Sequence, residues 1–106
     1  MSGTDKPGPN EIIHQTLRLR LMAALTALPM GNASLDSGLD FSRLKKLTGA
    51  TDGNLGAHIL ALEKAGYVRV DKSFVDRRPR TEVTATKAGR AAFAAHVAFL
   101  KSVIGE

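Results

Sequence analysis

The chain has 106 residues, no cysteine and a formal net charge of +5 at neutral pH. A chain of this length forms one domain with a single modest core and has no room for a second, ligand-binding domain. Because cysteine is absent, disulfides, thiolate metal sites and cysteine-based redox sensing are excluded.

The positive charge is concentrated in the middle of the chain. Residues 43–90 contain eleven Lys and Arg against five Asp and Glu, so this segment carries +6, more than the whole chain. A basic middle with nearly neutral ends favours a surface that binds a polyanion. Basic proteins are common, however, and the charge alone does not distinguish nucleic acid from other acidic partners.

The N-terminal part is predicted to be an arm followed by a helix. Residues 1–9 are rich in Gly, Pro, Ser and Thr, which predicts a flexible arm. Asn10 can cap a helix over residues 11–28, which ends before Pro29. One apolar stripe of this helix has the spacing of a core face and consists of Ile13, Leu17, Leu21, Ala24, Leu25 and Leu28. A second stripe lies on another side and predicts a partner surface, made of Ile12, Leu19 and Met22.

The same helix imitates a secretory signal, because Arg18 and Arg20 precede the apolar run 21–30. The polar residues before this run and Pro29 within it argue against export. No stretch approaches the roughly eighteen apolar residues that a membrane span requires. We therefore expect a cytoplasmic protein that does not associate with membranes.

Two helices joined by a tight turn are predicted in the middle of the chain. After a loop over residues 30–38, the pattern predicts helices over residues 41–47 and 52–65. Their N-caps and the glycines of their turns are Asp40, Gly49, Thr51 and Gly66. Such a pair forms a helix-turn-helix, whose second helix can enter the major groove of DNA. The alternative is an ordinary helical hairpin inside a bundle.

The second helix of this pair has one apolar face. Leu55, Ile59 and Leu62 are spaced to lie together on it. Asn54, Ala57, His58 and Ala61 point elsewhere, so the rest of the helix is free to contact another molecule.

A β-hairpin and a long helix complete the chain. Alternating apolar and polar residues predict strands over 67–72 and 81–85, with a loop over residues 73–80 that holds three arginines around Pro79. Thr86 can cap a last helix over residues 87–104. This helix also has two apolar stripes, one of Phe93, Val97, Leu100 and Ile104 and the other of Ala92, Phe99 and Val103.

Five motifs in this order resemble the MarR/ArsR-like winged-helix transcriptional regulators, in particular the small stand-alone ones. The motifs are Leu44–Leu55, His58–Ile59, Leu62–Val68, Arg78–Thr81 and Thr86–Arg90. The resemblance implies an α+β winged helix-turn-helix fold, with a three-helix core, a β-hairpin wing and a long C-terminal helix for dimerisation. It divides the single domain, 10–106, into a helix-turn-helix at 40–66, a wing at 67–85 and dimerisation helices at 11–28 and 87–104.

The resemblance also implies two groups of DNA-binding residues. The groove-facing side of the recognition helix would carry Thr51, Asp52, Asn54, Ala57 and His58, and the wing would carry Arg77, Arg78 and Arg80. Family members often have hydroxyl side chains where this chain has Gly56 and Ala57, so contacts with bases there must be apolar or absent.

The chemistry of these side chains agrees with that assignment. Asn54 can pair with an adenine edge, and His58 can donate to guanine or to a phosphate. Phosphates can be bound by Lys45, Lys46, Lys72, Arg90 and the wing arginines, although each lysine is also explained as a solvated surface charge. The position of Asp52 favours a role in stabilising the first helical turn over a contact with a base.

We therefore predict a homodimeric, sequence-specific regulator of double-stranded DNA, more naturally a repressor than an activator. The two-fold interface would be made by Ile12, Leu19, Met22, Phe99 and Val103. The alternatives are a winged helix that binds an acidic protein, and a switch that binds an unidentified small molecule at the dimer interface. No catalytic motif is present, and we expect no enzymatic activity, cofactor or metal, although His14 and His96 could meet to bind a metal or sense pH.

Overall fold

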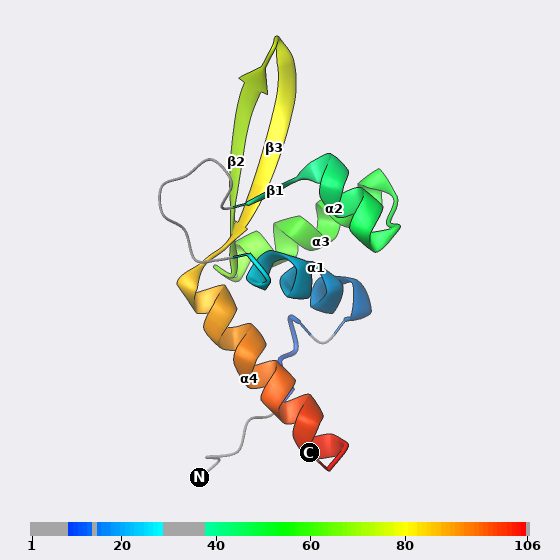
Figure 1. Cartoon of the computed structure of the whole chain (residues 1–106), viewed down its shortest axis with the longest axis vertical. Helices are drawn as coiled ribbons and strands as arrows, with labels where there is room; N and C mark the ends of the chain where they lie inside the picture. The colour runs from blue at the N-terminus through cyan, green and yellow to red at the C-terminus, as the bar shows by residue number, and fades with distance from the viewer. Residues whose placement is uncertain (1–8, 14, 29–37, 106) are drawn as a thin grey trace.

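Four helices and a three-stranded antiparallel sheet make up the computed structural model, which describes residues 9–13, 15–28 and 38–105 (Figure 1). In chain order the elements are α1 (Thr16–Thr26), β1 (Leu39–Asp40), α2 (Phe41–Thr48), α3 (Asp52–Lys64), β2 (Val68–Val75), β3 (Arg78–Ala85) and α4 (Lys87–Val103). The predicted α+β winged helix-turn-helix architecture is thus confirmed. Nearly all of the predicted arm and of the loop at 30–38, as well as His14, lies outside the described residues.

The starts and turns of α2, α3 and α4 follow from local side-chain chemistry. Gly49 and Gly66 adopt the left-handed φ values of 70° and 80° that the two turns require. At each helix start an oxygen of the predicted cap accepts a backbone N–H three residues on: Asp40 from Arg43 at 2.8 Å, Thr51 from Asn54 at 3.2 Å and Thr86 from Gly89 at 3.0 Å.

The first helix is shorter than the predicted range of 11–28. Asn10 does act as a cap, because its side-chain oxygen accepts the N–H groups of Ile12 and Ile13 at 2.9 and 3.0 Å. It caps a separate turn, however, and the chain leaves helical geometry at Gln15, whose ψ is 137°. The rotation of the helix over Thr16–Thr26 about its axis, which decides the residues that face the core, is therefore independent of the turn before it.

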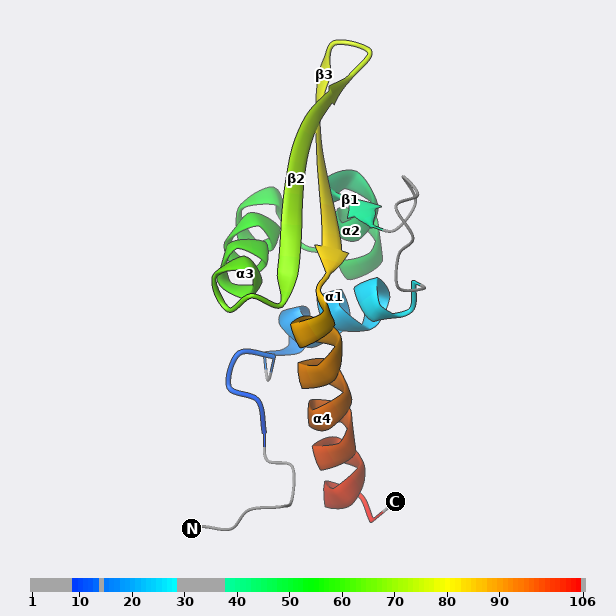
Figure 2. The same cartoon turned by 90° about the vertical axis from the view of Figure 1, so that its left-hand side faces the viewer.

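The sheet has the strand order β1-β3-β2, and its outer half is a free-standing hairpin. Short strand β1 pairs with β3 only through Leu39 with Val83 and Asp40 with Glu82. Strands β2 and β3 stay paired as far as Val75 and Arg78, so the hairpin projects well beyond the helices (Figure 2).

The tip of the hairpin is a two-residue turn rather than the predicted loop at 73–80. Asp76 and Arg77 both have positive φ, at 51° and 65°, which is the signature of a type I′ turn. This turn matches the twist of the flanking strands and lets the pairing continue to the end. Asp76 is a usual residue for the first central position, but Arg77 occupies the second, where glycine is preferred, so the sequence did not indicate the turn.

The core lies between α1, α2, α3 and the base of the sheet. Helix α1 contacts all three other helices and β3, so it buries a broad face made of Leu21, Met22 and Leu25. The remaining buried apolar side chains come from the turn before α1, from α2, α3 and the strands: Ile13, Leu44, Leu55, Ile59, Leu62, Val68, Val83 and Ala85.

Helix α4 leaves this core and runs away from it, on the side opposite the hairpin (Figure 1). Only Gly89 and His96 are buried along its length. Near its end, Val103 and Ile104 are 66% and 68% exposed. None of the described helices is long and apolar enough to span a bilayer.

The start of α4 is held against the turn that follows α3 by two hydrogen bonds from Thr86. The Thr86 N–H donates to the Tyr67 carbonyl at 3.0 Å, and the Thr86 hydroxyl donates to the Gly66 carbonyl at 2.6 Å. A β-carbon added at Gly89 would overlap the same Tyr67 carbonyl oxygen. Glycine is therefore required at position 89 for space rather than for backbone freedom.

We predict opposite effects of alanine at two helical glycines. Gly89→Ala should lower the free energy of unfolding by roughly 1–3 kcal/mol, because a backbone atom cannot move aside easily. Gly56→Ala in α3 is the control, since a β-carbon there meets nothing within 4 Å. It should raise stability by about 0.5–1 kcal/mol, because alanine favours helix. Urea unfolding measures both, and equal stabilities would contradict the close packing at Gly89.

Candidate nucleic-acid interface

Helix α3 presents an exposed side that begins at its N-terminus. Leu55, Ile59 and Leu62 are buried, as their spacing predicts. The opposite side and the first turn are exposed, and they carry four of the five predicted groove-facing residues: Thr51, Asp52, Asn54 and Ala57. Because the backbone N–H groups of the first turn also point outward there, this end of the helix favours an anion such as phosphate.

A surface ion pair joins α2 to the first turn of α3. The Lys45 ammonium lies 2.6 Å from an Asp52 carboxylate oxygen, with side-chain exposures of 49% and 72%. Such an exposed pair adds little stability, but it offsets part of the charge of Lys45. Asp52 also complements the positive end of the α3 dipole. Lys46 stays exposed and makes no ion pair within the described part of the chain.

The two faces of the projecting hairpin carry different side chains. Successive residues of a strand point to opposite faces, and residues directly across an antiparallel pair share a face. The inner face continues from the buried Val83 and consists of Lys72, Phe74, Pro79 and Thr81. The outer face consists of Ser73, Val75, Arg78 and Arg80, and Arg77 stands at the turn between them.

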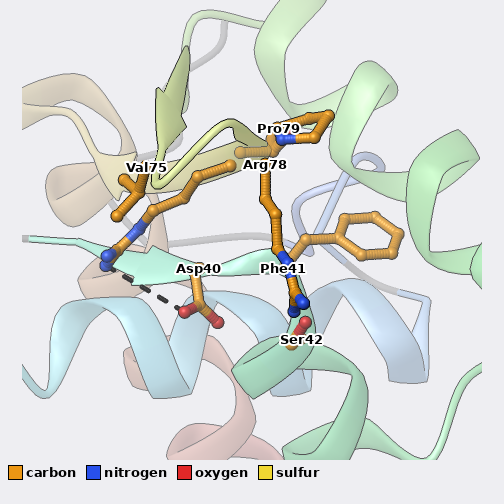
Figure 3. A pocket seen from close by; sticks show the side chains of 8 residues that line it. Asp40, Phe41, Ser42, Val75, Arg78 and Pro79 are labelled. Carbon is orange, nitrogen blue, oxygen red and sulfur yellow. Dashed lines mark ion pairs between the residues drawn. The ribbon is translucent and has the colours of Figure 1, made fainter.

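Arg80 is held by carboxylates of its own chain. Its guanidinium lies 3.6 Å from Glu82. It also lies 4.0 Å from Asp40, an ion pair that the dashed line in Figure 3 marks. Asp40 also caps α2, so a single carboxylate links the wing to the helix-turn-helix. By contrast, Arg77 and Arg78 are exposed and have no ion-pair partner among the residues that the structure describes.

The predicted groove-facing residue His58 has a hydrogen-bond partner within its own chain. It is half-buried against α1, where its Nδ1 accepts a hydrogen bond from Arg18 Nε at 2.9 Å. Arg18 Nη1 donates in turn to the Ile12 carbonyl at 3.2 Å. His58 therefore ties the recognition helix to α1 and to the turn before it.

The environment of His58 also changes its titration. Burial, and secondarily the positive charge of Arg18, lower the pKa of His58 below its ordinary value of 6.5. The neutral imidazole is the form that can accept the Arg18 hydrogen bond. The sequence shows no sign of this pair, because 40 positions separate its members.

The five residues predicted to form a dimer interface are divided by the structure. Met22 is completely buried within one chain, so its assignment to a partner surface is wrong. Ile12 and Leu19 are partly buried and pack against the same core. Phe99 is half-buried beside His96, at 6.2 Å between ring centroids, and Val103 is exposed. The free apolar surface therefore lies on α4 rather than on α1.

His96 is a buried anchor for the start of the chain. Its Nδ1 accepts the Asn10 N–H at 3.1 Å, and the Asn10 amide donates to the Tyr67 hydroxyl at 3.0 Å. His14, its predicted partner, lies outside the described residues. Within the described part of the chain, no group of three His, Asp or Glu side chains could hold a metal ion.

Residues 17–104 match the family described as winged helix DNA-binding domain, and the chain belongs to this family. The predicted resemblance to winged-helix transcriptional regulators is thereby confirmed, and the protein is a DNA-binding regulator by class.

Individual relatives agree with this class. The chain is 33% identical to a transcriptional regulator homologue from Pyrococcus horikoshii OT3, with a TM-score of 0.76 over 90% of this chain and 86% of that one. It is 32% identical to the uncharacterized protein MJ0432 of Methanocaldococcus jannaschii, over 78% of this chain and 82% of the relative. A structure of NadR in complex with 4-hydroxyphenylacetate shares the fold at 21% identity and a TM-score of 0.65, over 91% of this chain and 67% of that one.

The lowered pKa of His58 predicts a pH-dependent stability. As pH falls below 6.5, the unfolded chain binds the proton before the folded chain does, so the free energy of unfolding should fall. His58→Gln keeps an acceptor for Arg18 but does not titrate. The stability of the wild type relative to this variant should decline on acidification, as measured by urea unfolding between about pH 7.5 and 5. Parallel pH profiles of the two proteins would contradict the shift.

Proposed function

We propose that this protein is a homodimeric, sequence-specific transcriptional repressor that binds double-stranded DNA in the cytoplasm, and we expect no enzymatic activity. The observation that carries the proposal is the exposed N-terminal side of α3 in a member of the winged helix DNA-binding family. A basic hairpin projects from the same domain (Figure 2). A helix of this kind can enter a major groove while the hairpin reaches the backbone or the adjacent minor groove.

The proposed contacts fall into two classes. Thr51, Asn54 and Ala57 lie where bases would be read, and Asn54 is the side chain best suited to pair with adenine. Phosphates would be bound by the cations that lack a carboxylate partner among the described residues, Lys46, Lys72, Arg77 and Arg78. Lys45 and Arg80 would contribute less, because Asp52, Asp40 and Glu82 already offset part of their charge.

Variants of the two classes should behave differently in DNA titrations. Asn54→Ala should reduce discrimination between an operator and a mutated operator by about 1–3 kcal/mol. Arg78→Ala should weaken binding to all sequences alike and reduce the salt slope by about one unit, and Arg80→Ala should do so less. If Asn54→Ala lost equal affinity for specific and for random DNA, the assignment of Asn54 as a base-reading residue would be rejected. A wild type whose binding is insensitive to salt would favour a protein partner instead.

The apolar end of α4 supports the proposed dimer. This helix leaves the core and exposes Val103 and Ile104 beside the half-buried Phe99 and Leu100. A second α4, related by a two-fold axis, would cover these side chains in both copies at once. Two recognition helices about 34 Å apart would then match half-sites one DNA turn apart, as on a near-palindromic operator.

A charge at the end of α4 should separate the dimer without unfolding the chain. Val103→Lys should weaken dimerisation at least about tenfold, because each copy loses the burial of an apolar side chain. Ser102→Lys is the matched control, since position 102 is exposed and outside both apolar stripes. Sedimentation equilibrium measures the association. If Val103→Lys remained as dimeric as the control, the interface would lie elsewhere.

A second candidate role is a response to a small aromatic carboxylate. Thr26, Arg90, Phe93 and Val97 line an open hollow of about 520 Å³ between α1 and α4. One guanidinium N–H of Arg90 donates to the Thr26 carbonyl at 3.2 Å, whereas its Nε is buried without a hydrogen-bond partner among the described residues. The hollow thus places a cation, Arg90, near an aromatic side chain, Phe93, and the ligand of the NadR structure is a small aromatic carboxylate that such a pair can bind.

A further inference from the structure

The wing carries an unusually exposed aromatic side chain. Phe74 is 76% exposed, the highest value among the exposed large apolar residues of the described chain. It belongs to the outer half of the hairpin, which extends past β1 and projects beyond the helices (Figure 2). Directly across the strand pair is Pro79, so the two side chains form a small apolar patch on the inner face.

The charge around this patch indicates its partner. The hairpin between residues 72 and 81 contains four Lys and Arg and one Asp. The resulting charge of +3 over ten residues favours a polyanionic partner, whereas arginines beside an aromatic ring alone would also suit a protein interface. Lys72 shares the face of the phenyl ring, while Arg77 stands at the tip and Arg78 on the opposite face. A partner with negative phosphates around apolar sugars and bases fits this arrangement.

The inner face also points to the side where DNA would lie. Lys72 and Thr81 of this face line a hollow of about 240 Å³ together with Leu60 of α3. The hairpin therefore rises beside the recognition helix with its inner face toward it. Because a strand advances about 3.3 Å per residue, Phe74 lies about 13 Å farther along the hairpin than Val70. This distance would let it reach the DNA groove next to the one that α3 enters.

We propose that Phe74 is an apolar wedge that enters the minor groove next to the site of α3 and bends the DNA there. Apolar side chains that enter a minor groove part neighbouring base steps and kink the duplex. Such a contact adds affinity without neutralising a phosphate, and it favours sequences that deform easily. This inference rests on the proposed DNA-binding function and assigns a contact that is separate from the arginines of the wing.

The test compares Phe74→Ala with Val75→Ala, a neighbouring apolar truncation on the outer face. The probes are a genomic DNA fragment selected by the wild type and a random duplex of equal length, with dyes at both ends. Phe74→Ala should lose about tenfold to a hundredfold in affinity and show a smaller bend by energy transfer, with an unchanged salt slope. Val75→Ala should match the wild type in affinity, bend and slope.

The outcomes separate this inference from the proposed function. If the wild type binds and Arg78→Ala weakens binding while Phe74→Ala binds and bends DNA as the wild type does, only the wedge is rejected. If Phe74→Ala instead changes the sedimentation of the protein without DNA, the ring contacts a second copy and the inference is wrong. If the wild type binds no duplex even at low salt, the proposed function itself fails.

Discussion

The burial of Leu55, Ile59 and Leu62 is the constraint on which the rest of the molecule depends. Three apolar side chains on one face fix both the position of α3 and its rotation about its own axis, and this rotation decides which residues stay exposed. The hydrogen bond from Arg18 to His58 holds the flank of the same helix against α1. The surface that we assign to DNA is therefore defined by what α3 buries.

The basic side chains of the surface differ in how free they are to meet a phosphate. Lys45 and Arg80 already lie beside carboxylates of their own chain, whereas Arg77 and Arg78 do not within the described residues. These pairs are exposed, so solvent and salt weaken them, and a phosphate can compete for the cation. Net charge alone thus overstates the number of equivalent phosphate contacts.

Much of the fold could be predicted because its signals are local. Asp40, Thr51 and Thr86 cap helices through groups three residues away, and alternation predicts the inner parts of both strands. The long-range features could not be predicted in this way. The position of His58 depends on Arg18, far away in the sequence. Which side of the helix Met22 lies on depends on where α1 begins, and α1 starts five residues later than the cap at Asn10 suggested.

The two-residue turn at Asp76 and Arg77 has a consequence for related sequences. It fixes the pairing register between β2 and β3. One residue inserted or deleted at the tip would therefore move every side chain of β3 beyond it to the other face of the hairpin. Arginines would then replace Pro79 opposite the phenyl ring. In related sequences, the length of this hairpin should therefore change in steps of two residues. A change of one residue should be accompanied by a β-bulge that returns the side chains of β3 to their original faces.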